Sequence, residues 1–353
     1  MKKIIIKNYG IITPLGNTQE TINNLHLGKS AVKATNEYGL PVSLAYIDKA
    51  YPRTPKEIVA YYKQMGYGKY NSPQTLFIYA AAKGDINKIV NAPTVGRLRA
   101  AVEKHYDGDY SPVLGEQANE VARDLGLGDC RIIFVSNACA SGAVAIDTAK
   151  ICLESGEFNT AVIFGLEQIT EFVVKGFHCL NAVSPTGAKP FDESRDGMSL
   201  GEGSGICVLS TGGTEGSDVC VLGCGASNDA NHRTGPSRTG DGLALAIKRA
   251  LKSANINAED IDAVKCHATA TIYNDAMETK ALESVFGDRV PPIVAMKGAI
   301  GHLSGAGSMI ETVIAAEFLK KGKIVASDAV INNILCLSAG FGGINTAVIL
   351  GKI

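Results

Sequence analysis

The chain of 353 residues is long enough for one large or two ordinary domains, and 46% of its residues are hydrophobic, so it can bury a substantial core. Its formal net charge of −1 gives no overall attraction to nucleic acid or anionic lipid, and no apolar run approaches the roughly 20 residues of a membrane-spanning helix. The nine cysteines follow no zinc or disulfide spacing and no signal peptide precedes them, so we expect reduced thiols in a cytoplasmic protein without a metal or other cofactor.

Predicted strands and helices alternate along the chain, which is typical of an α/β fold with a largely parallel sheet. In the first half we expect strands at residues 4–6, 76–79, 132–135 and 160–164, with helices at 54–64, 115–125 and 143–154. In the second half we expect helices at 243–253, 275–285 and 307–320, with strands at 263–266 and 293–295. The order of strand, small-residue turn, helix and strand occurs around residues 132–163 and again around 293–326. We therefore predict two equivalent halves, 1–215 and 216–353.

Cys139 lies in a turn of small residues, NACASG at 137–142, between a predicted strand and a predicted helix. At a helix N-terminus, unpaired N–H groups and the helix dipole favour a thiolate, which would make Cys139 a nucleophile. A buried structural cysteine at a crowded turn is the alternative that these residues leave open. The predicted duplication places His302 at the matching strand end, so both side chains would face the cleft where open α/β sheets bind ligands.

Two of the six histidines occupy turns of this kind. His267 opens the sequence HATAT at 267–271, and His302 lies in the glycine-rich sequence KGAIGHLSGAG at 297–307. A single histidine in such a turn is more often a hydrogen-bonded core residue. One cysteine and two histidines at strand ends, however, meet the requirement for a thiolate with two proton or oxyanion partners.

In their order along nearly the whole chain, these motifs resemble those of elongating β-ketoacyl synthases of the Cys-His-His type in the thiolase superfamily. The matching segments are GIITPLG at 10–16, NACASG at 137–142, KPFD at 189–192 with RDG at 195–197 and GEG at 201–203, DANH at 229–232 with Pro236, HATAT at 267–271, residues 297–305 with Glu311, and GFGG at 340–343 with Asn345. The resemblance implies a thiolase-like fold, with two pseudo-equivalent βα halves in a layered αβαβα arrangement.

The resemblance also implies a decarboxylative Claisen condensation. An acyl group on Cys139 would be joined to a malonyl thioester to give a 3-oxoacyl thioester. Backbone N–H groups of Cys139 and Phe341 would form the oxyanion hole for the acyl group, and His267 and His302 would stabilise the enolate.

Supporting roles follow from the same resemblance. Lys297 and Glu311 would orient the histidines and balance their charge, although a purely structural ion pair is an equal alternative. Thr269 and Thr271 would bind the pantetheine arm of the thioester. The remaining implied substrate-binding residues are His232, Ala339 and Asn345.

The sequence departs from the family pattern at several positions. Ala268 and Ala270 stand where glycine is common, and Ala339 stands where many elongating members carry an aromatic residue near the gating Phe341. Residues 46–110 match the family poorly. We therefore expect a specialised synthase of a fatty-acid, polyene or polyketide pathway rather than the housekeeping enzyme.

Two other identities remain open from the sequence. A non-catalytic subunit of the chain-length-factor type has the same fold but typically lacks the cysteine. A thiolase would carry a second catalytic cysteine in the last glycine-rich loop, where this chain has Phe341, with Cys336 before it. A priming synthase would carry asparagine in place of one histidine, which His267 contradicts.

The partners that the resemblance implies are an acyl carrier protein, its acyl and malonyl thioesters, and a second ketosynthase subunit in a homodimer or heterodimer. We expect no nucleic-acid partner and no membrane span.

Overall fold

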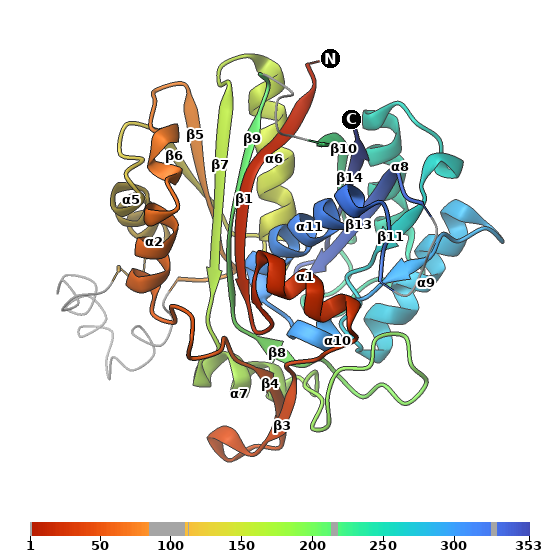
Figure 1. The fold of residues 1–353 in the computed structure, drawn as a ribbon. Coiled ribbons are helices and arrows are strands. Elements are labelled where there is room, and N and C mark those ends of the chain that lie inside the picture. Colours follow the sequence, from red (N-terminus) through yellow and green to blue (C-terminus); the bar gives the residue numbers. More distant parts are fainter. Residues whose placement is uncertain (1, 85–109, 112, 213–217, 326–329) are drawn as a thin grey trace.

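The computed structural model describes residues 2–84, 110, 111, 113–212, 218–325 and 330–353 (Figure 1). Its strands are β1 (Ile4–Thr13), β2 (Gly16–Asn17), β3 (Lys33–Thr35), β4 (Val42–Ala45), β5 (Thr75–Ala80), β6 (Arg131–Val135), β7 (Thr160–Glu167), β8 (Leu200–Gly201), β9 (Gly203–Ser210), β10 (Val219–Asn228), β11 (Ala263–Lys265), β12 (Ile293–Val294), β13 (Asn333–Gly340) and β14 (Ile344–Lys352). Its α-helices are α1 (Thr18–His26), α2 (Pro55–Gln64), α5 (Leu114–Leu125), α6 (Ser141–Ser155), α7 (Glu171–Cys179), α8 (Asp241–Ala254), α9 (Ile272–Phe286), α10 (Lys297–Ile300) and α11 (Ser304–Lys321). Short 3₁₀ helices cover Glu37–Gly39, Tyr67–Tyr70 and Ala258–Asp260.

The large sheet has the strand order β12-β11-β13-β14-β10-β1-β9-β7-β5-β6, and β2 pairs with β1. The pairing is the same outward from the centre in both directions. On one side β1, β9 and β7 are antiparallel neighbours, followed by β5 and β6 in parallel. On the other side β10, β14 and β13 are antiparallel neighbours, followed by β11 and β12 in parallel. The two sets meet where β1 pairs with β10 through Ile4 and Val221.

The predicted α/β class is confirmed, but the sheet is mixed rather than largely parallel. β13 and β14 are joined by a short turn at residues 341–343, in which Gly342 and Gly343 have φ angles of +87° and +81°. Such a turn can join only antiparallel strands, whereas parallel strands need a long crossover. Within the large sheet, parallel pairing is therefore restricted to the outer strands, whose connections contain helices.

Helices α6 and α11 pack against each other between the two sets of strands, while α2 and α5 cover one outer face and α8 and α9 the other (Figure 1). The close packing of the central pair depends on small residues. A Cβ atom on Gly142 of α6 would lie 2.5 Å from the backbone N of Met309 in α11. Gly305 of α11 is required for a different close approach, because a Cβ there would lie 2.2 Å from the backbone N of Ala82, just after β5. Nearly every residue of α11 is buried, as expected of a helix enclosed on all sides. The layers are αβαβα.

One predicted strand is wrong. Residues 324–326 were expected to repeat the role of residues 161–163, but Ile324 and Val325 lie outside any strand and residue 326 lies outside the described residues. The strand equivalent to β7 is β13. Ile324 is buried in the central core from a loop, which explains its apolar character without a strand.

The predicted division at residues 215 and 216 falls outside the described residues and remains a prediction. Among the helices that the structure describes, none has a stretch long and apolar enough to cross a membrane.

Candidate active site

Cys139 lies in a tight turn between the end of β6 and the start of α6. The turn is closed by Ser141, whose hydroxyl accepts the N–H of Asn137 at 2.8 Å and lies 2.6 Å from the carbonyl oxygen of Ala138, to which it donates. Ala138 has a φ angle of +48°, a conformation that costs an L-residue roughly 1–2 kcal/mol. The surrounding packing therefore holds Cys139 in one position.

The environment of the Cys139 thiol opposes the expected thiolate. Burial raises its pKa to about 12, although the nearby Lys297 and Lys83 act in the opposite direction. Desolvation disfavours the charged form of an acid, whereas a helix N-terminus favours it. The thiolate at Cys139 therefore stays a prediction, and burial acts against it.

The turn that begins at His267 is fixed by two carboxylates of α9. Glu278 accepts the backbone N–H groups of His267 at 2.5 Å and Ala268 at 2.6 Å, and Asp275 accepts that of Ala270 at 3.1 Å. Ala268 and Ala270 have φ angles of +51° and +63°, the left-handed region that glycine adopts without strain. The turn therefore keeps a glycine-type backbone at both alanines, and the carboxylates hold it there.

His302 lies between α10 and α11 and pairs with the backbone before β9. The backbone N–H of His302 donates to the carbonyl of Ser199 at 2.7 Å, and the backbone carbonyl of His302 accepts the N–H of Gly201 in β8 at 3.0 Å. A Cβ on Gly201 would lie 2.3 Å from the carbonyl oxygen of Ile300, so glycine is required for this close approach. The imidazole is thereby anchored through its own backbone.

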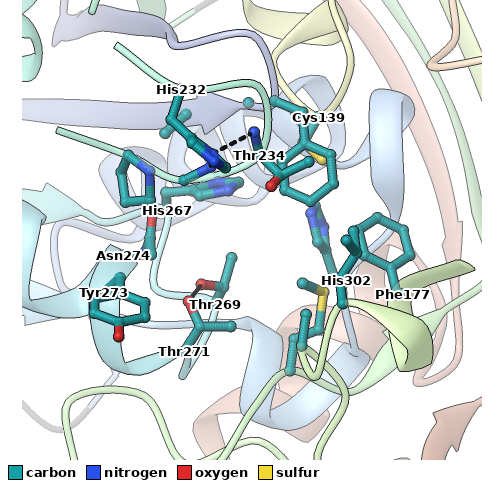
Figure 2. Close-up of a pocket in the computed structure, with 18 of the residues that line it drawn as sticks. Cys139, Phe177, His232, Thr234, His267, Thr269, Thr271, Tyr273, Asn274 and His302 are labelled. Atoms are coloured by element: carbon teal, nitrogen blue, oxygen red, sulfur yellow. Dashed lines mark hydrogen bonds between the residues drawn. The ribbon is translucent and has the colours of Figure 1, made fainter.

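These three residues meet at one cavity of about 460 Å³, and Figure 2 shows their side chains around a common space, with Thr269 and Thr271 on another side. The ring centroids of His267 and His302 are 5.3 Å apart and nearly perpendicular. The hydroxyls of Thr269 and Thr271 are 2.9 Å apart. The cavity is also lined by the predicted site residues His232, Ala339, Phe341 and Asn345.

Both imidazoles are neutral at physiological pH. Burial and the charge of Lys297 lower the pKa of His302 to about 3, and the same causes place the pKa of His267 well below its usual value. A neutral imidazole carries one ring N–H, and neither Nδ1 has a hydrogen-bond partner among the described residues. The pair is suited to hydrogen bonding with a ligand oxygen.

Lys297 and Glu311 do not line the cavity but lie buried behind it. Lys297 Nζ is 2.6 Å from Glu311 Oε1, and Lys265 Nζ is 2.9 Å from Glu311 Oε2. Sequence reasoning missed Lys265. Its one signal was a lysine at the end of a predicted buried strand, where a charged side chain needs a partner.

Phe341 stands between two cavities that share Cys139. The second cavity, of about 260 Å³, is mainly apolar and includes Phe172, Val173 and Phe177 of α7. The rings of Phe341 and Phe177 are 5.5 Å apart. Ala339 lines the larger cavity, and Phe341 lines both. Sequence reasoning did not identify α7 as part of the site.

His232 and Asn345 also hold the loops of the cavity wall. His232 Nδ1 accepts the N–H groups of Thr234 at 3.1 Å and Gly235 at 2.9 Å, the first of which is drawn in Figure 2. Asn345 Nδ2 donates to Asp229 Oδ1 at 2.8 Å. Within the described residues, no three His, Cys, Asp or Glu side chains gather as a metal site requires.

Comparison with known proteins agrees with this geometry. Residues 117–213 match the family described as "Beta-ketoacyl synthase, N-terminal domain", and residues 219–330 match "Beta-ketoacyl synthase, C-terminal domain". One chain of a ketosynthase solved in complex with its chain length factor, from Xenorhabdus doucetiae, superposes with a TM-score of 0.84 at 23% identity, and the match covers 100% of this chain and 98% of that one.

Two curated relatives extend the comparison. A mitochondrial protein of Schizosaccharomyces pombe, named provisionally as a 3-oxoacyl-acyl-carrier-protein synthase, is 27% identical over 423 residues, which cover 100% of this chain and 99% of that protein. The 3-oxoacyl-acyl-carrier-protein synthase 2 of Rhizobium meliloti is 34% identical over 253 residues, which cover 62% of this chain and 60% of that protein. With both domain matches in order around the Cys139 turn and the two histidines, the chain belongs to the β-ketoacyl synthase family of the thiolase superfamily.

Proposed function

We propose that the protein condenses an acyl group, carried as a thioester of Cys139, with a malonyl thioester to give a 3-oxoacyl thioester and CO₂. The observation that carries this proposal is that a thiol and two neutral imidazoles, from three distant parts of the chain, line one cavity. The names of the relatives support an acyl carrier protein as the donor.

The first half-reaction transfers the acyl group to Cys139. The sulfur of Cys139 attacks the thioester carbonyl, the bond from that carbonyl to the carrier sulfur breaks, and the proton of Cys139 leaves with the carrier thiol. The exchange is neutral overall, so it does not require a permanent thiolate. We expect the helix N-terminus at α6 to stabilise the charge that develops during the transfer.

The backbone supports the proposed oxyanion hole at Cys139 and Phe341. The position of a Cβ on Gly340 would lie 3.2 Å from the backbone N of Cys139, so the strand that ends before Phe341 passes directly beside the nucleophile turn. A side chain on residue 340 would crowd this contact.

The second half-reaction forms the new carbon–carbon bond. The malonyl carboxylate leaves as CO₂, its bonding electrons form an enolate, and the enolate carbon attacks the acyl thioester on Cys139. Collapse of that intermediate expels the Cys139 sulfur, which regains a proton. Ring N–H groups of His267 and His302 would donate to the enolate oxygen, and such donors are strongest in a site from which water is excluded.

The alternatives predict different outcomes at the same residues. A chain-length-factor-like subunit would carry no acyl group of its own. A thiolase would need a second thiol in the cavity, but Cys336 lies within β13 and is not among the cavity-lining residues that the structure describes. The retained Cys139, His267 and His302 favour the condensing enzyme.

We also propose that the chain works as a dimer with itself or with a related subunit. β6 is the edge strand of the large sheet, and Phe134 on it is 50% exposed. An unpaired strand edge beside an exposed aromatic side chain is a ready surface for a second sheet.

The test is to incubate the purified chain with an acyl carrier protein loaded with acyl groups and another loaded with malonyl groups. Mass spectrometry should find the acyl chain extended by two carbons as a 3-oxoacyl thioester. If a related subunit must be added before product forms, while this chain never carries acyl groups, the scaffold role replaces this proposal.

A further inference from the structure

Lys265 occupies the point where β11 and β13 separate. The two strands pair in parallel up to Lys265 and Cys336, after which β11 ends and leads to His267, while β13 continues to Gly340. The carbonyl of Leu337, the next residue along β13, accepts a hydrogen bond from Lys265 Nζ at 2.6 Å. The side chain thus bridges the strands that lead to the His267 turn and the Phe341 loop.

The same ammonium group also reaches Glu311. Lys265 Nζ donates to one carboxylate oxygen of Glu311 at 2.9 Å, and Lys297 Nζ donates to the other at 2.6 Å. One carboxylate is thus shared between two lysines. All three side chains are at most 2% exposed. The charge of Glu311 raises the pKa of Lys265, and the two lysines lower that of Glu311, although burial opposes both shifts. Burial lowers the pKa of Lys297, and the charge of Glu311 opposes that shift. The network therefore places two amino groups against a single carboxylate.

A buried ion without a counter-ion destabilises the folded state. We therefore expect the second lysine of the network to serve an anion that forms during the reaction. The proposed reaction creates negative charge on the Cys139 sulfur, on the acyl oxygen in the oxyanion hole and on the enolate held by the histidines. Lys297 acts on the Cys139 thiol, and both lysines act on the two histidines. We propose that Lys265 is a positioning residue that supplies a surplus positive charge to the Lys265–Glu311–Lys297 network, and that this charge stabilises the anions formed at Cys139 and the two histidines.

Other titratable groups face the network from the elements packed around it. They are Glu278 of α9, the thiol of Cys336 on β13, and the imidazoles of His267 and His302. Burial raises the pKa of Glu278 to about 7 and that of Cys336 to about 12, so Cys336 stays neutral and Glu278 titrates near neutrality. Glu278 is present in every variant, so each pH profile is measured across the whole range in which Glu278 titrates.

Two substitutions separate charge from hydrogen bonding. Lys265→Met removes both, whereas Lys265→Gln removes the charge and keeps an amide that can donate to Leu337 or Glu311. The matched control is Lys150→Met. Lys150 is also buried and is 2.6 Å from a glutamate, Glu154, but this pair lies along α6 and lines neither cavity that contains Cys139.

The experiment measures the rate at which iodoacetamide alkylates Cys139 in the full-length protein as a function of pH, read by peptide mass spectrometry. One lost charge in a buried site corresponds to a shift of roughly one pH unit. We expect both Lys265 variants to show the Cys139 profile displaced to higher pH by about one unit, or about tenfold slower alkylation at a fixed pH below the midpoint. Lys150→Met should follow the wild type.

Two results would overturn this inference. If Lys265→Gln follows the wild type while Lys265→Met does not, the hydrogen bond rather than the charge matters. If neither variant shifts, or if Lys150→Met shifts equally, Lys265 has only a structural role. The role given to the Lys265 charge rests on the proposed function, but the alkylation of Cys139 can be measured without any condensation. A wild-type protein that forms no 3-oxoacyl product would refute the function and leave the thiol measurement intact.

Discussion

The two halves of the sheet have the same strand order but place different charges next to the site. In the first half, Lys83 and Glu167 form one ion pair at 2.7 Å, and the same carboxylate accepts the N–H of Ala82 at 2.7 Å. In the second half, two lysines share Glu311. The first half therefore places a thiol beside a balanced pair, while the second places two histidines in front of two amino groups that share one carboxylate.

This difference assigns the two halves to separate tasks. In the proposed reaction, the first half supplies a buried thiol that attacks the incoming thioester. The second half would supply the neutral donors and the positive potential that an enolate requires. Because the charge lies on the histidine side, we expect substitutions there to affect decarboxylation and condensation more than acyl transfer.

The largest effect is expected from removing the nucleophile of the first half. Cys139→Ala should reduce condensation below detection, because no other thiol lines the cavity among the described residues. The assay is formation of 3-oxoacyl carrier protein, with circular dichroism as the check on folding. Substantial product from a folded Cys139→Ala variant would contradict the role assigned to this half.

Removing a histidine should separate the half-reactions. His267→Ala and His302→Ala should each lower condensation by about 100- to 10,000-fold, the usual range for lost donors to an oxyanion, while acylation of Cys139 remains measurable. Acylation is followed by the mass of the intact protein, and condensation by product. An equal loss of both steps would remove the distinction between the halves.

Ala339 tests the wall of the second half. An aromatic side chain has roughly 150–250 Å² of surface, so Ala339→Phe should remove space from the cavity beside Phe341. We expect roughly tenfold slower condensation with long or conjugated acyl donors and little change with acetyl or butyryl donors. Thermal melting should show an intact fold. The same loss at every chain length would mean that Ala339 does not restrict the acyl group, and the case for a specialised substrate would lose its main support.

The smallest effect concerns stability rather than rate. Burial raises the pKa of Glu278 to about 7 from an ordinary value of 4.5. The folded state then binds the proton more tightly than the unfolded state, so stability is full below about pH 4.5 and is lost as the pH rises to about 7. In wild type, the titration of Glu278 should lower the free energy of unfolding by about 1–3 kcal/mol over this pH range, and Glu278→Gln should abolish that decrease. Urea unfolding at several pH values between these limits measures it, and parallel curves for both proteins would show that Glu278 does not titrate there.

The sequence allowed some of this to be predicted, and the limits have physical causes. The paired strand–turn–helix patterns around Cys139 and His302 indicated a duplication because the small residues needed for the α6–α11 contact are visible as motifs. The mixed sheet was missed because antiparallel pairing depends on the turn after β13, which local periodicity does not reveal.

The sequence predicted residues that the structure brings to one cavity, but it did not predict their electrostatics. The state of the Cys139 thiol depends on burial by distant segments, and the function of Lys265 depends on Glu311, 46 residues away. Neither distance nor burial can be read from adjacent residues. The left-handed backbone at Ala268 and Ala270 was similarly hidden, because alanine does not indicate it.

The central claim is that Cys139 carries the acyl group, and peptide mapping tests it most directly. The wild-type chain is incubated with an acyl-loaded carrier protein, digested, and searched for the acyl mass on every cysteine-containing peptide. We expect the acyl group on Cys139, and we expect it to disappear when malonyl-loaded carrier is added, as the extended product forms. An acyl group on Cys130, Cys152 or Cys336 instead, or one on Cys139 that malonyl thioester does not discharge, would contradict this claim.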